Sequence, residues 1–146
     1  MSRVVVDSSV IVKWVNRDNE LNLDRADKLL NDVREGRVGL IAPELAKYEV
    51  GNALVKRGLL EVQAFQSLGT VYSLPVRFVP ETEELADETY QMANKVRQTE
   101  HPPKFTYYDA SFAALARQEG AILVTANPKH QIKIVGVKVV ALGNYK

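Results

Sequence analysis

The segment RVVVDSSVIVKWV at residues 3–15 decides the fold class of this chain. Residues 3–6 form a short β-branched run without polar alternation, which is typical of a central strand buried on both faces of a sheet. Asp7, Ser8 and Ser9 follow, and these residue types favour the start of a helix. An apolar run comes directly after them. The segment therefore predicts a buried strand that ends at an acid and leads into a helix.

The same alternation of short apolar strands with helices continues along the chain. Further strands are predicted over residues 39–42, 76–79, 122–125 and 138–141. Helices are predicted over residues 22–35, 43–57, 61–74, 81–98 and 106–118. Pro43 is expected to open the second of these helices, at a position where its missing N–H costs nothing.

This pattern predicts an α/β fold in three layers. A single domain over residues 1–146 would hold a central parallel sheet of about five strands, flanked by helices on both faces. In such a sheet the functional site lies beyond the carboxyl ends of the strands, where the strand order reverses. We therefore look for chemistry in the residues that follow the strands.

Composition narrows the possible function classes. The chain has 146 residues with 19 Lys and Arg, 18 Asp and Glu, and no cysteine. The lack of cysteine excludes a disulfide scaffold, an iron–sulfur cluster, a cysteine zinc site and thiol chemistry. A net charge of +1 argues against a protein that binds nucleic acid through one large basic surface. A local basic groove is still compatible with this charge.

The chain shows no targeting or membrane-spanning segment. The apolar run near the N-terminus is too short for a signal peptide and is broken by Asp7. No segment approaches the ~20 apolar residues that a membrane span needs. We therefore expect a cytoplasmic protein without a membrane partner.

Asp7 and Glu49 are acids in apolar surroundings. Asp7 directly follows three valines, where an ionised carboxylate costs free energy unless a cation or hydrogen-bond donors stabilise it. The alternative for Asp7 is a helix N-cap. The helical neighbours of Glu49, three and four residues away, are apolar except for the amide of Asn52. The alternative for Glu49 is a residue at the boundary of a buried helix face.

Asp109 is the third acid in such a setting. Its helical neighbours are Phe105, Thr106, Phe112 and Ala113. Aspartate also lowers helix propensity in the interior of a helix, so its presence there indicates a specific role. The alternative is a first-turn acid that the helix dipole favours.

The three acids together predict a metal site, because a doubly wound fold can bring them to one sheet edge. Converging carboxylates raise one another's pKa unless a cation neutralises them. Mg²⁺ and Mn²⁺ are hard cations that take carboxylate and water ligands. Such a cation generates hydroxide near neutral pH and clamps an in-line phosphodiester displacement. Asp7, Glu49 and Asp109 are therefore the candidate catalytic and metal-binding residues.

Two further residues are candidates for contacts with a nucleic acid. Lys13 is the first choice among several isolated cations for a phosphate contact. Tyr108, with its neighbour Tyr107, stands beside Asp109 and is the best-placed aromatic for stacking on a base. The alternatives are a solvated charge for Lys13 and a core or boundary aromatic for Tyr108.

Four segments give the chain a resemblance to a known family. They are VVDSSVIVKW (residues 5–14), PEL through EVGNAL (43–54), YDASFAALA (108–116) and LVTAN (123–127). In this order and spacing the sequence resembles the PIN-domain ribonucleases, specifically the VapC-type toxins of bacterial and archaeal toxin–antitoxin pairs. The resemblance spans nearly the whole chain and is specific for the family, but not for a target RNA.

The resemblance implies a parallel sheet flanked by helices and an acidic pocket that holds Mg²⁺ or Mn²⁺. It implies metal-dependent endonuclease action on RNA, a homodimer, and a small VapB-like antitoxin that occupies the pocket. By motif position, Asp7, Glu49 and Asp109 correspond to the metal-site acids of the family. The same correspondence makes Ser9, Asn52 and Thr125 polar supports around that site.

Asn127 departs from the family pattern, which usually has a fourth aspartate at this position. An amide oxygen binds water or a metal ion but brings no charge, so we expect one well-held cation and a weaker second one. Asn127 is thus a further candidate metal ligand, and its rival role is to order the turn before Pro128. The departure also supports an alternative function, a catalytically reduced PIN-like protein that acts by binding RNA or protein.

A third class of protein also places an aspartate at the end of its first strand. Phosphoacceptor domains of the receiver or haloacid-dehalogenase type do so, and they expect further acids close by. This chain has Ser9 where such an acid would stand, which argues against that class.

Overall fold

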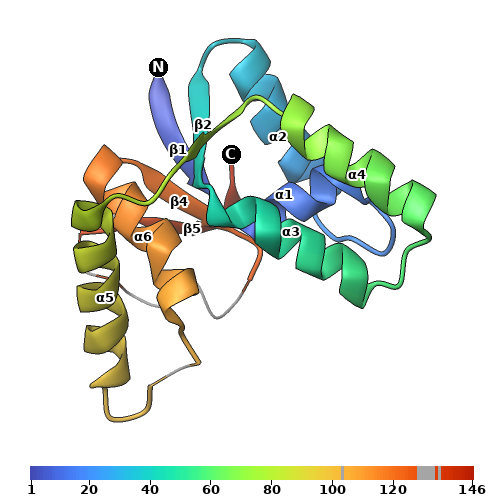
Figure 1. The fold of residues 1–146 in the computed structure, drawn as a ribbon. Coiled ribbons are helices and arrows are strands. Elements are labelled where there is room, and N and C mark those ends of the chain that lie inside the picture. The colour runs from blue at the N-terminus through green and yellow to red at the C-terminus, as the bar shows by residue number, and fades with distance from the viewer. Residues whose placement is uncertain (103, 128–133, 135) are drawn as a thin grey trace.

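Five parallel strands form the centre of the fold in the computed structural model, which describes residues 1–102, 104–127, 134 and 136–146 (Figure 1). The strands are β1 (Ser2–Val6), β2 (Val38–Pro43), β3 (Val76–Val79), β4 (Ile122–Thr125) and β5 (Val139–Ala141). Their order in the sheet is β3-β2-β1-β4-β5, and every pairing is parallel. The predicted sheet is therefore confirmed.

The central position of β1 explains its uniform valines. Val5 pairs with Ile41 of β2 on one side and with Leu123 of β4 on the other. Val4, Val5 and Val6 are at most 1% exposed, so both faces of the strand are covered. The chain builds β2 and β3 on one side of β1 and then crosses to place β4 and β5 on the other. The strand order therefore reverses at β1, at the end where Asp7 follows.

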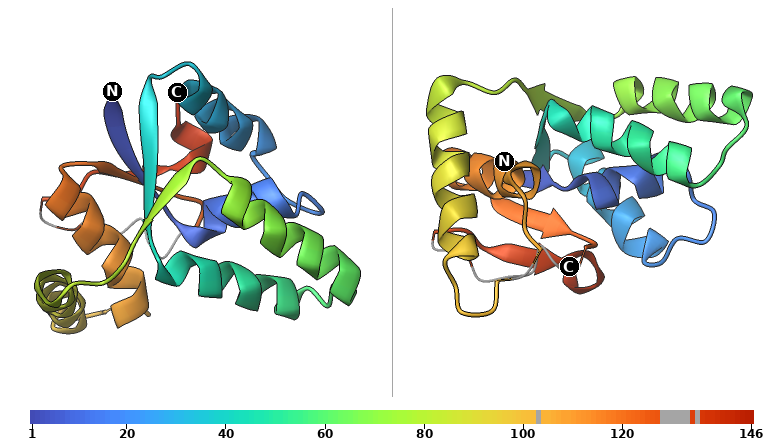
Figure 2. Two further views of the ribbon diagram at one scale, coloured as in Figure 1. Left: turned by 45° about the horizontal axis from the view of Figure 1, so that its top comes forward. Right: turned by 60° about the horizontal axis from the view of Figure 1, so that its bottom comes forward.

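Six α-helices within the described ranges cover the two faces of the sheet. They are α1 (Ser8–Val15), α2 (Leu23–Arg34), α3 (Leu45–Lys56), α4 (Glu61–Ser73), α5 (Glu83–Arg97) and α6 (Tyr107–Glu119). Figure 2 shows α5 and α6 on one side and α1 to α4 on the other, which gives the three predicted layers. No helix in the described part of the chain is long and apolar enough to cross a membrane.

Helix α6 packs against β1, β2 and β4 because its sequence is small and apolar. All residues from Ala110 to Ala116 are buried, and Phe112 is fully so. The alanines let the helix backbone approach the sheet closely, and α5 covers the outer side of α6. The helix ends at Gly120, whose φ of 61° is a left-handed conformation that glycine adopts easily.

Pro43 corrects one expectation from the sequence. It does not open a helix but is the last residue of β2, and α3 begins at Leu45. The pairing of β2 with β1 ends at Ile41, so the missing N–H of Pro43 falls beyond the ladder to β1. On the other side Pro43 pairs with Val79, and the N–H of Glu44 donates to the Val79 carbonyl at 2.9 Å. The strand therefore extends as far as the proline.

A buried acid on α2 holds the C-terminal residues. Asp32 is 4% exposed and accepts hydrogen bonds from the Tyr145 hydroxyl at 2.6 Å and from Arg37 Nη2 at 2.6 Å. The Lys28 ammonium lies 3.1 Å from the same carboxylate. In addition, Arg25 donates to the backbone carbonyl of Tyr145 at 2.6 Å. These bonds fix a short 3₁₀ turn (Leu142–Asn144), which the sequence did not predict, against α2.

Candidate active site

Asp7 is a buried carboxylate at the point where the strand order reverses. It is 1% exposed and occupies the N-cap position of α1, but its side chain makes no capping hydrogen bond. Instead Oδ2 accepts from the Thr125 hydroxyl at 2.7 Å and from the Ser9 hydroxyl at 2.9 Å. The helix-cap alternative therefore does not describe this side chain. The carboxylate is held by residues from β4 and from the first turn of α1.

Backbone N–H groups after β4 orient both of these hydroxyls. The N–H of Ala126 donates to Ser9 Oγ at 3.0 Å, and the N–H of Asn127 donates to Thr125 Oγ1 at 3.0 Å. A hydroxyl that accepts from the backbone directs its own proton elsewhere, here to Asp7. Hydrogen bonds to an ionised acceptor are short and strong, so this arrangement stabilises the charged carboxylate.

Ser8 joins Glu49 to Asp7. Its hydroxyl lies 3.1 Å from Glu49 Oε1 and 3.4 Å from Asp7 Oδ1, so it bridges acids that are 42 positions apart in the sequence. Glu49 is half-buried on α3, and Asn52 is exposed one turn further along the same helix. From the sequence alone, Ser8 is only an alternative to Asp7 as the helix cap. The signal that points to its role is a second hydroxyl directly after the strand-ending acid.

Asp109 belongs to a capping box at the start of α6. The N–H of Thr106 donates to Asp109 Oδ2 at 3.0 Å, and the N–H of Asp109 donates to Thr106 Oγ1 at 3.1 Å. Asp109 is 5% exposed. Thr106 followed three residues later by Asp109 is a sequence signature of this motif. Asp109 thus has a local structural function, and its metal-binding role stays a prediction.

The remaining predicted residues lie in different surroundings. Lys13 is 6% exposed, and its ammonium lies 2.9 Å from Glu20 Oε1, so a phosphate contact would require this ion pair to open. Tyr108 is 58% exposed and its ring meets Tyr107 edge to face. Asn127 is half-buried beside Thr125. Its alternative role is to order the turn before Pro128, and Pro128 lies outside the described residues.

The donor chemistry fits a hard divalent cation. All candidate ligands are oxygen atoms, and Ser8 brings the carboxylates of Asp7 and Glu49 together. Mg²⁺ is typically bound through one or two carboxylates while it keeps several waters. No group of three or more histidine or acidic side chains within the described ranges is arranged to hold a metal ion. Asp7 and Glu49, joined through Ser8, therefore form the core of the candidate site, and the metal-binding role of Asp109 stays a prediction.

Comparison with known proteins identifies the family. The family model for the PIN domain matches residues 4–135, which include all three acids. The chain belongs to the PIN-domain family. Members of this family are in general nucleases that use divalent metal ions. No curated protein sequence matches this PIN domain significantly.

Solved structures share the fold of this PIN domain over nearly its whole length. VapBC2 from Rickettsia felis, bound to a promoter DNA fragment, superposes with a TM-score of 0.72 at 14% identity and covers 95% of this chain and 98% of its own. The Pyrobaculum aerophilum protein PAE2754 gives 0.63 at 25% identity, with 97% and 90% covered. Mycobacterium tuberculosis VapC20, a sarcin–ricin loop cleaving toxin, gives 0.64 at 18% identity, with 92% and 98% covered. The fold of this PIN domain is therefore VapC-like.

Proposed function

We propose that this protein is a metal-dependent endoribonuclease and the toxin of a type II toxin–antitoxin pair that acts in the cytoplasm. The observation that carries the proposal is the buried Asp7 carboxylate, held by Ser9 and Thr125 and joined to Glu49 through Ser8. A buried carboxylate with oriented donors is a preorganised ligand for a cation. The VapC-like fold adds support, and VapC20 is itself a toxin that cleaves RNA of the sarcin–ricin loop.

In this proposal Asp7, Glu49 and Asp109 hold Mg²⁺ or Mn²⁺, with the amide oxygen of Asn127 as a further ligand. When bound, the cation supplies Lewis acidity at the phosphodiester and lowers the pKa of its water. Ser9 and Thr125 fix the Oδ2 atom of Asp7, and Ser8 holds the Glu49 carboxylate beside it. These hydroxyls set the positions of the acids before the substrate arrives.

A metal titration combined with an RNA cleavage assay tests this function. Asp7→Asn should abolish cleavage and lower Mn²⁺ affinity in calorimetry by more than the ~10–100-fold that loss of an outer-shell partner costs. Asp24→Asn is the matched control, because the Asp24 side chain is 81% exposed on α2. The proposal is wrong if Asp7→Asn binds Mn²⁺ and cleaves RNA as the control does.

Asn127 favours a second candidate function, a catalytically reduced PIN-like protein that binds RNA or protein. The N–H of Asn127 supports Thr125, but its amide brings no charge to the site. For a ribonuclease with a weak second metal, Asn127→Asp should tighten Mn²⁺ binding and speed RNA cleavage at low metal concentration. For the reduced protein, wild type would bind RNA without cleaving it at any metal concentration. If wild type cleaves RNA and Asn127→Asp shows the same metal dependence of cleavage, Asn127 is not a metal ligand.

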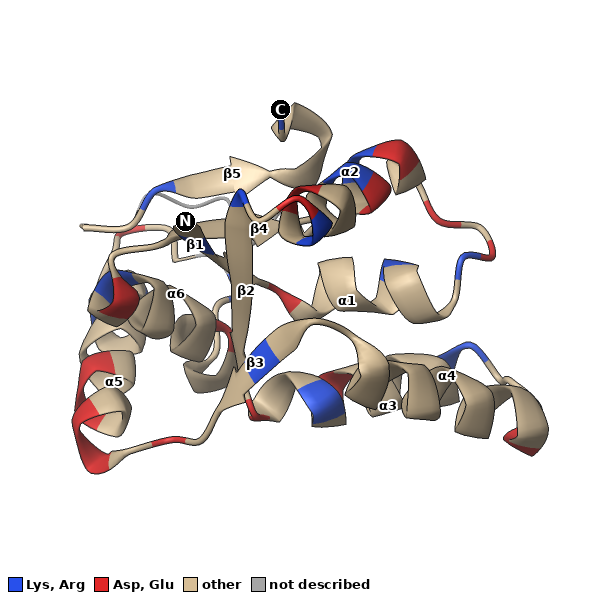
Figure 3. Cartoon of the chain, turned by 90° about the horizontal axis from the view of Figure 1, so that it is seen from above, with Lys and Arg blue, Asp and Glu red and all other residues tan. Residues whose placement is uncertain are grey.

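A protein partner is part of this proposal. Six large apolar side chains are exposed on α3, α4 and the turn between them: Tyr48, Val55, Leu60, Val62, Phe65 and Tyr72. Figure 3 shows that α4 carries little charge along its length. Exposed apolar patches mark protein interaction sites. Several structural relatives were solved as toxin–antitoxin complexes, including DNA-bound VapBC from Salmonella typhimurium, which supports a small antitoxin here.

We expect the antitoxin to cover this apolar surface and to reach the acids with an arginine, which pairs with carboxylates bidentately. We also expect a homodimer. Co-expression with a small protein encoded next to this gene should give a stable complex, and replacing the arginine that reaches the acids should restore RNA cleavage. A complex that forms but leaves cleavage and Mn²⁺ binding intact would count against inhibition at the acids.

A further inference from the structure

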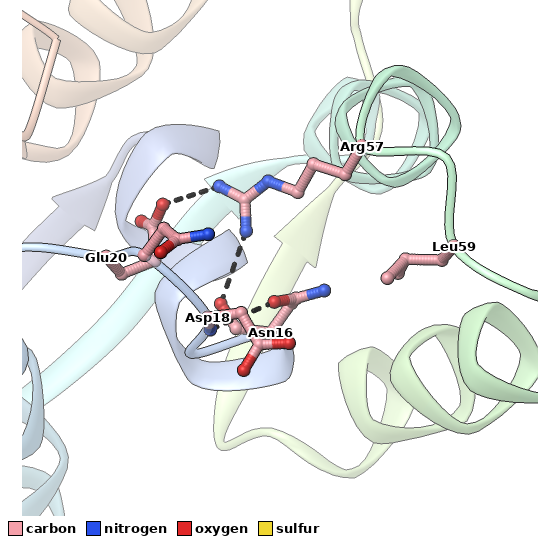
Figure 4. A pocket seen from close by; sticks show the side chains of 6 residues that line it. Asn16, Asp18, Glu20, Arg57 and Leu59 are labelled. Atoms are coloured by element: carbon pink, nitrogen blue, oxygen red, sulfur yellow. Dashed lines mark hydrogen bonds and ion pairs between the residues drawn. The ribbon is translucent and has the colours of Figure 1, made fainter.

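A polar hollow lies at the far end of α1 from the acids. It has a volume of about 420 Å³, within the range of roughly 300–1,000 Å³ that is common for small-ligand sites. Its lining residues come from the loop after α1 and the turn after α3: Asn16, Asp18, Asn19, Glu20, Arg57 and Leu59 (Figure 4). None of the three candidate acids lines this hollow, so it is a separate feature of the surface.

Two helices connect the hollow to the candidate active site. At one end Ser8 of α1 bonds to Glu49 of α3, and at the other Arg57 donates to the Asn16 carbonyl at 3.4 Å. The two helices therefore run side by side in the same direction from the acids to the hollow. Eight or nine helical residues rise roughly 12–14 Å. At about 3.4 Å per stacked nucleotide, this distance corresponds to roughly four nucleotides of one strand.

Asn16 presents a fixed hydrogen-bond donor to the hollow. The residue is 9% exposed, and its Oδ1 accepts the N–H of Asp18 at 3.1 Å. Because Oδ1 takes this bond, the amide orientation is set and Nδ2 is the atom that remains for a ligand. Figure 4 shows this nitrogen directed away from Asp18, on the side of Leu59. The exposed Asp18 carboxylate adds a hydrogen-bond acceptor to this donor, and the Leu59 side chain adds an apolar contact.

A cluster of charged side chains holds the lining residues of the hollow in place. Glu20 Oε2 accepts from Arg57 at 2.5 Å, and Glu20 Oε1 lies 2.9 Å from the Lys13 ammonium. The Lys13 and Glu20 side chains are 7% and 13% exposed, so their ion pair is largely sheltered from water, whereas Arg57 is 29% exposed. The cluster ties the loop after α1 to the C-terminal end of α3. The hollow is therefore formed before any ligand arrives.

Further amides extend the polar lining. A second hollow of about 290 Å³ shares Asn16, Asp18 and Leu59 with the first. It continues along α4, where Gln63 and Gln66 are among its lining residues. Amide and carboxylate side chains read base edges by paired donors and acceptors, whereas phosphate sites are built from cations.

We propose that this hollow binds one base of the substrate RNA, roughly four nucleotides from the cleaved phosphodiester, and so contributes to cleavage-site selection. The inference rests on the proposed ribonuclease function. The ligand class is a nucleobase edge that offers an acceptor to Asn16 Nδ2 and an N–H donor to the Asp18 carboxylate. Recognition of single-stranded RNA commonly uses such unstacked bases.

An NMR titration of the metal-free protein tests the hollow without cleavage. The probes are the four nucleoside 5′-monophosphates, with ribose 5-phosphate as the control for phosphate alone. We expect the side-chain NH₂ signals of Asn16 to shift with one or two of the nucleotides and not with ribose 5-phosphate. No shift with any nucleotide, an equal shift with ribose 5-phosphate, or a response only to a co-expressed protein partner would overturn the proposal.

Cleavage of a randomised RNA pool tests the contribution to selection. Asn16→Asp keeps an oxygen that accepts the Asp18 N–H and replaces the Nδ2 donor by a negatively charged acceptor. A base preference at one fixed position about four nucleotides from the cut should fall about 10-fold, the effect of one hydrogen bond to the base. Asn94→Asp on α5 makes the same chemical change away from the hollow and should keep the wild-type profile.

The outcomes separate the two proposals. If wild type cleaves and Asp7→Asn does not, the ribonuclease function stands, and an unchanged profile in Asn16→Asp overturns base binding alone. If wild type does not cleave RNA with any metal, the ribonuclease function fails, and the NMR titration still decides whether the hollow binds a base.

Discussion

The hydroxyl of Thr125 lies 2.7 Å from Oδ2 of Asp7, although the two residues are 118 positions apart in the sequence. Thr125 is fully buried at the end of β4, and Asp7 follows β1, the strand that pairs with β4. The N–H of Asn127 donates to the same hydroxyl and directs its proton to the carboxylate. This contact makes the last residue of β4 a positioning residue for the first candidate ligand.

Replacing Thr125 should weaken metal binding through Asp7. Thr125→Val keeps the branched shape and removes the donor, so we expect Mn²⁺ affinity to fall ~10–100-fold, as for other partners of metal ligands. The free energy of unfolding of the metal-free protein should fall by about 1–3 kcal/mol, because a buried carboxylate loses a partner. Thr125→Ser keeps the hydroxyl and should recover most of the affinity in calorimetry. Equal affinities in the valine and serine variants would contradict the positioning role.

Ser8 should affect the metal site more than the stability of the fold. Ser8→Ala removes the hydroxyl between Asp7 and Glu49, and the net effect of such a bond is about 1 kcal/mol, roughly fivefold in Mn²⁺ affinity. The unfolding free energy should change by less than about 0.5 kcal/mol, because Ser8 is only half-buried. Ser73→Ala at the end of α4 is the control for removal of a serine hydroxyl. An affinity as high as that of the control would show that Ser8 does not hold Glu49 for the metal.

The two roles of Asp109 should separate in two substitutions. Asp109→Asn keeps an oxygen that accepts the Thr106 N–H, so the capping box and the thermal stability should change little. Asp109→Ala removes this acceptor and should lower the unfolding free energy by about 0.5–2 kcal/mol. Both variants should lose Mn²⁺ affinity if the charge of Asp109 reaches the cation. Wild-type affinity in Asp109→Asn would restrict the residue to helix capping.

Asp32 should make stability depend on acid pH. The hydrogen bonds from Tyr145 and Arg37 lower the pKa of this carboxyl to about 2, from the ordinary value of about 3.9. Because the folded-state pKa is the lower one, the stabilisation is fully present above about pH 4 and is lost as the pH falls through about 2. At pH 7, Asp32→Asn should lower the unfolding free energy by about 1.5–3 kcal/mol, as expected for hydrogen bonds to a charged group.

Thermal melts of wild type and Asp32→Asn between pH 2 and 7 provide the measurement. The difference between the two melting temperatures should shrink as the pH falls below 4. Asp24→Asn removes an exposed acid from the same helix and should follow the wild-type curve. A constant difference between wild type and Asp32→Asn across this range would contradict the lowered pKa.

Local patterns were sufficient to predict much of the fold. Strand and helix periodicity depend only on neighbours in the chain. The uniform valines therefore predict that β1 is buried on both faces, and the small apolar residues predict that α6 is buried. The amphipathic spacing predicts that α2 buries one face. The order of strands and helices then predicted a parallel sheet, while the resemblance to the PIN-domain family came from four sequence motifs. The same reasoning was wrong at Pro43, because the end of β2 is set by its pairing with β3, which lies more than 30 residues away.

The candidate site divides in the same way. That Asp7 ends a buried strand and that Asp109 lies near a helix start follows from the residues beside them. That two hydroxyls converge on one oxygen of Asp7, that Ser8 bridges to Glu49, and that Lys13 is paired with Glu20 follows only from the tertiary structure. Local sequence sets the direction of a side chain relative to its own element. The partner it meets there depends on which strand or helix packs alongside, and that is decided by the packing of the whole chain.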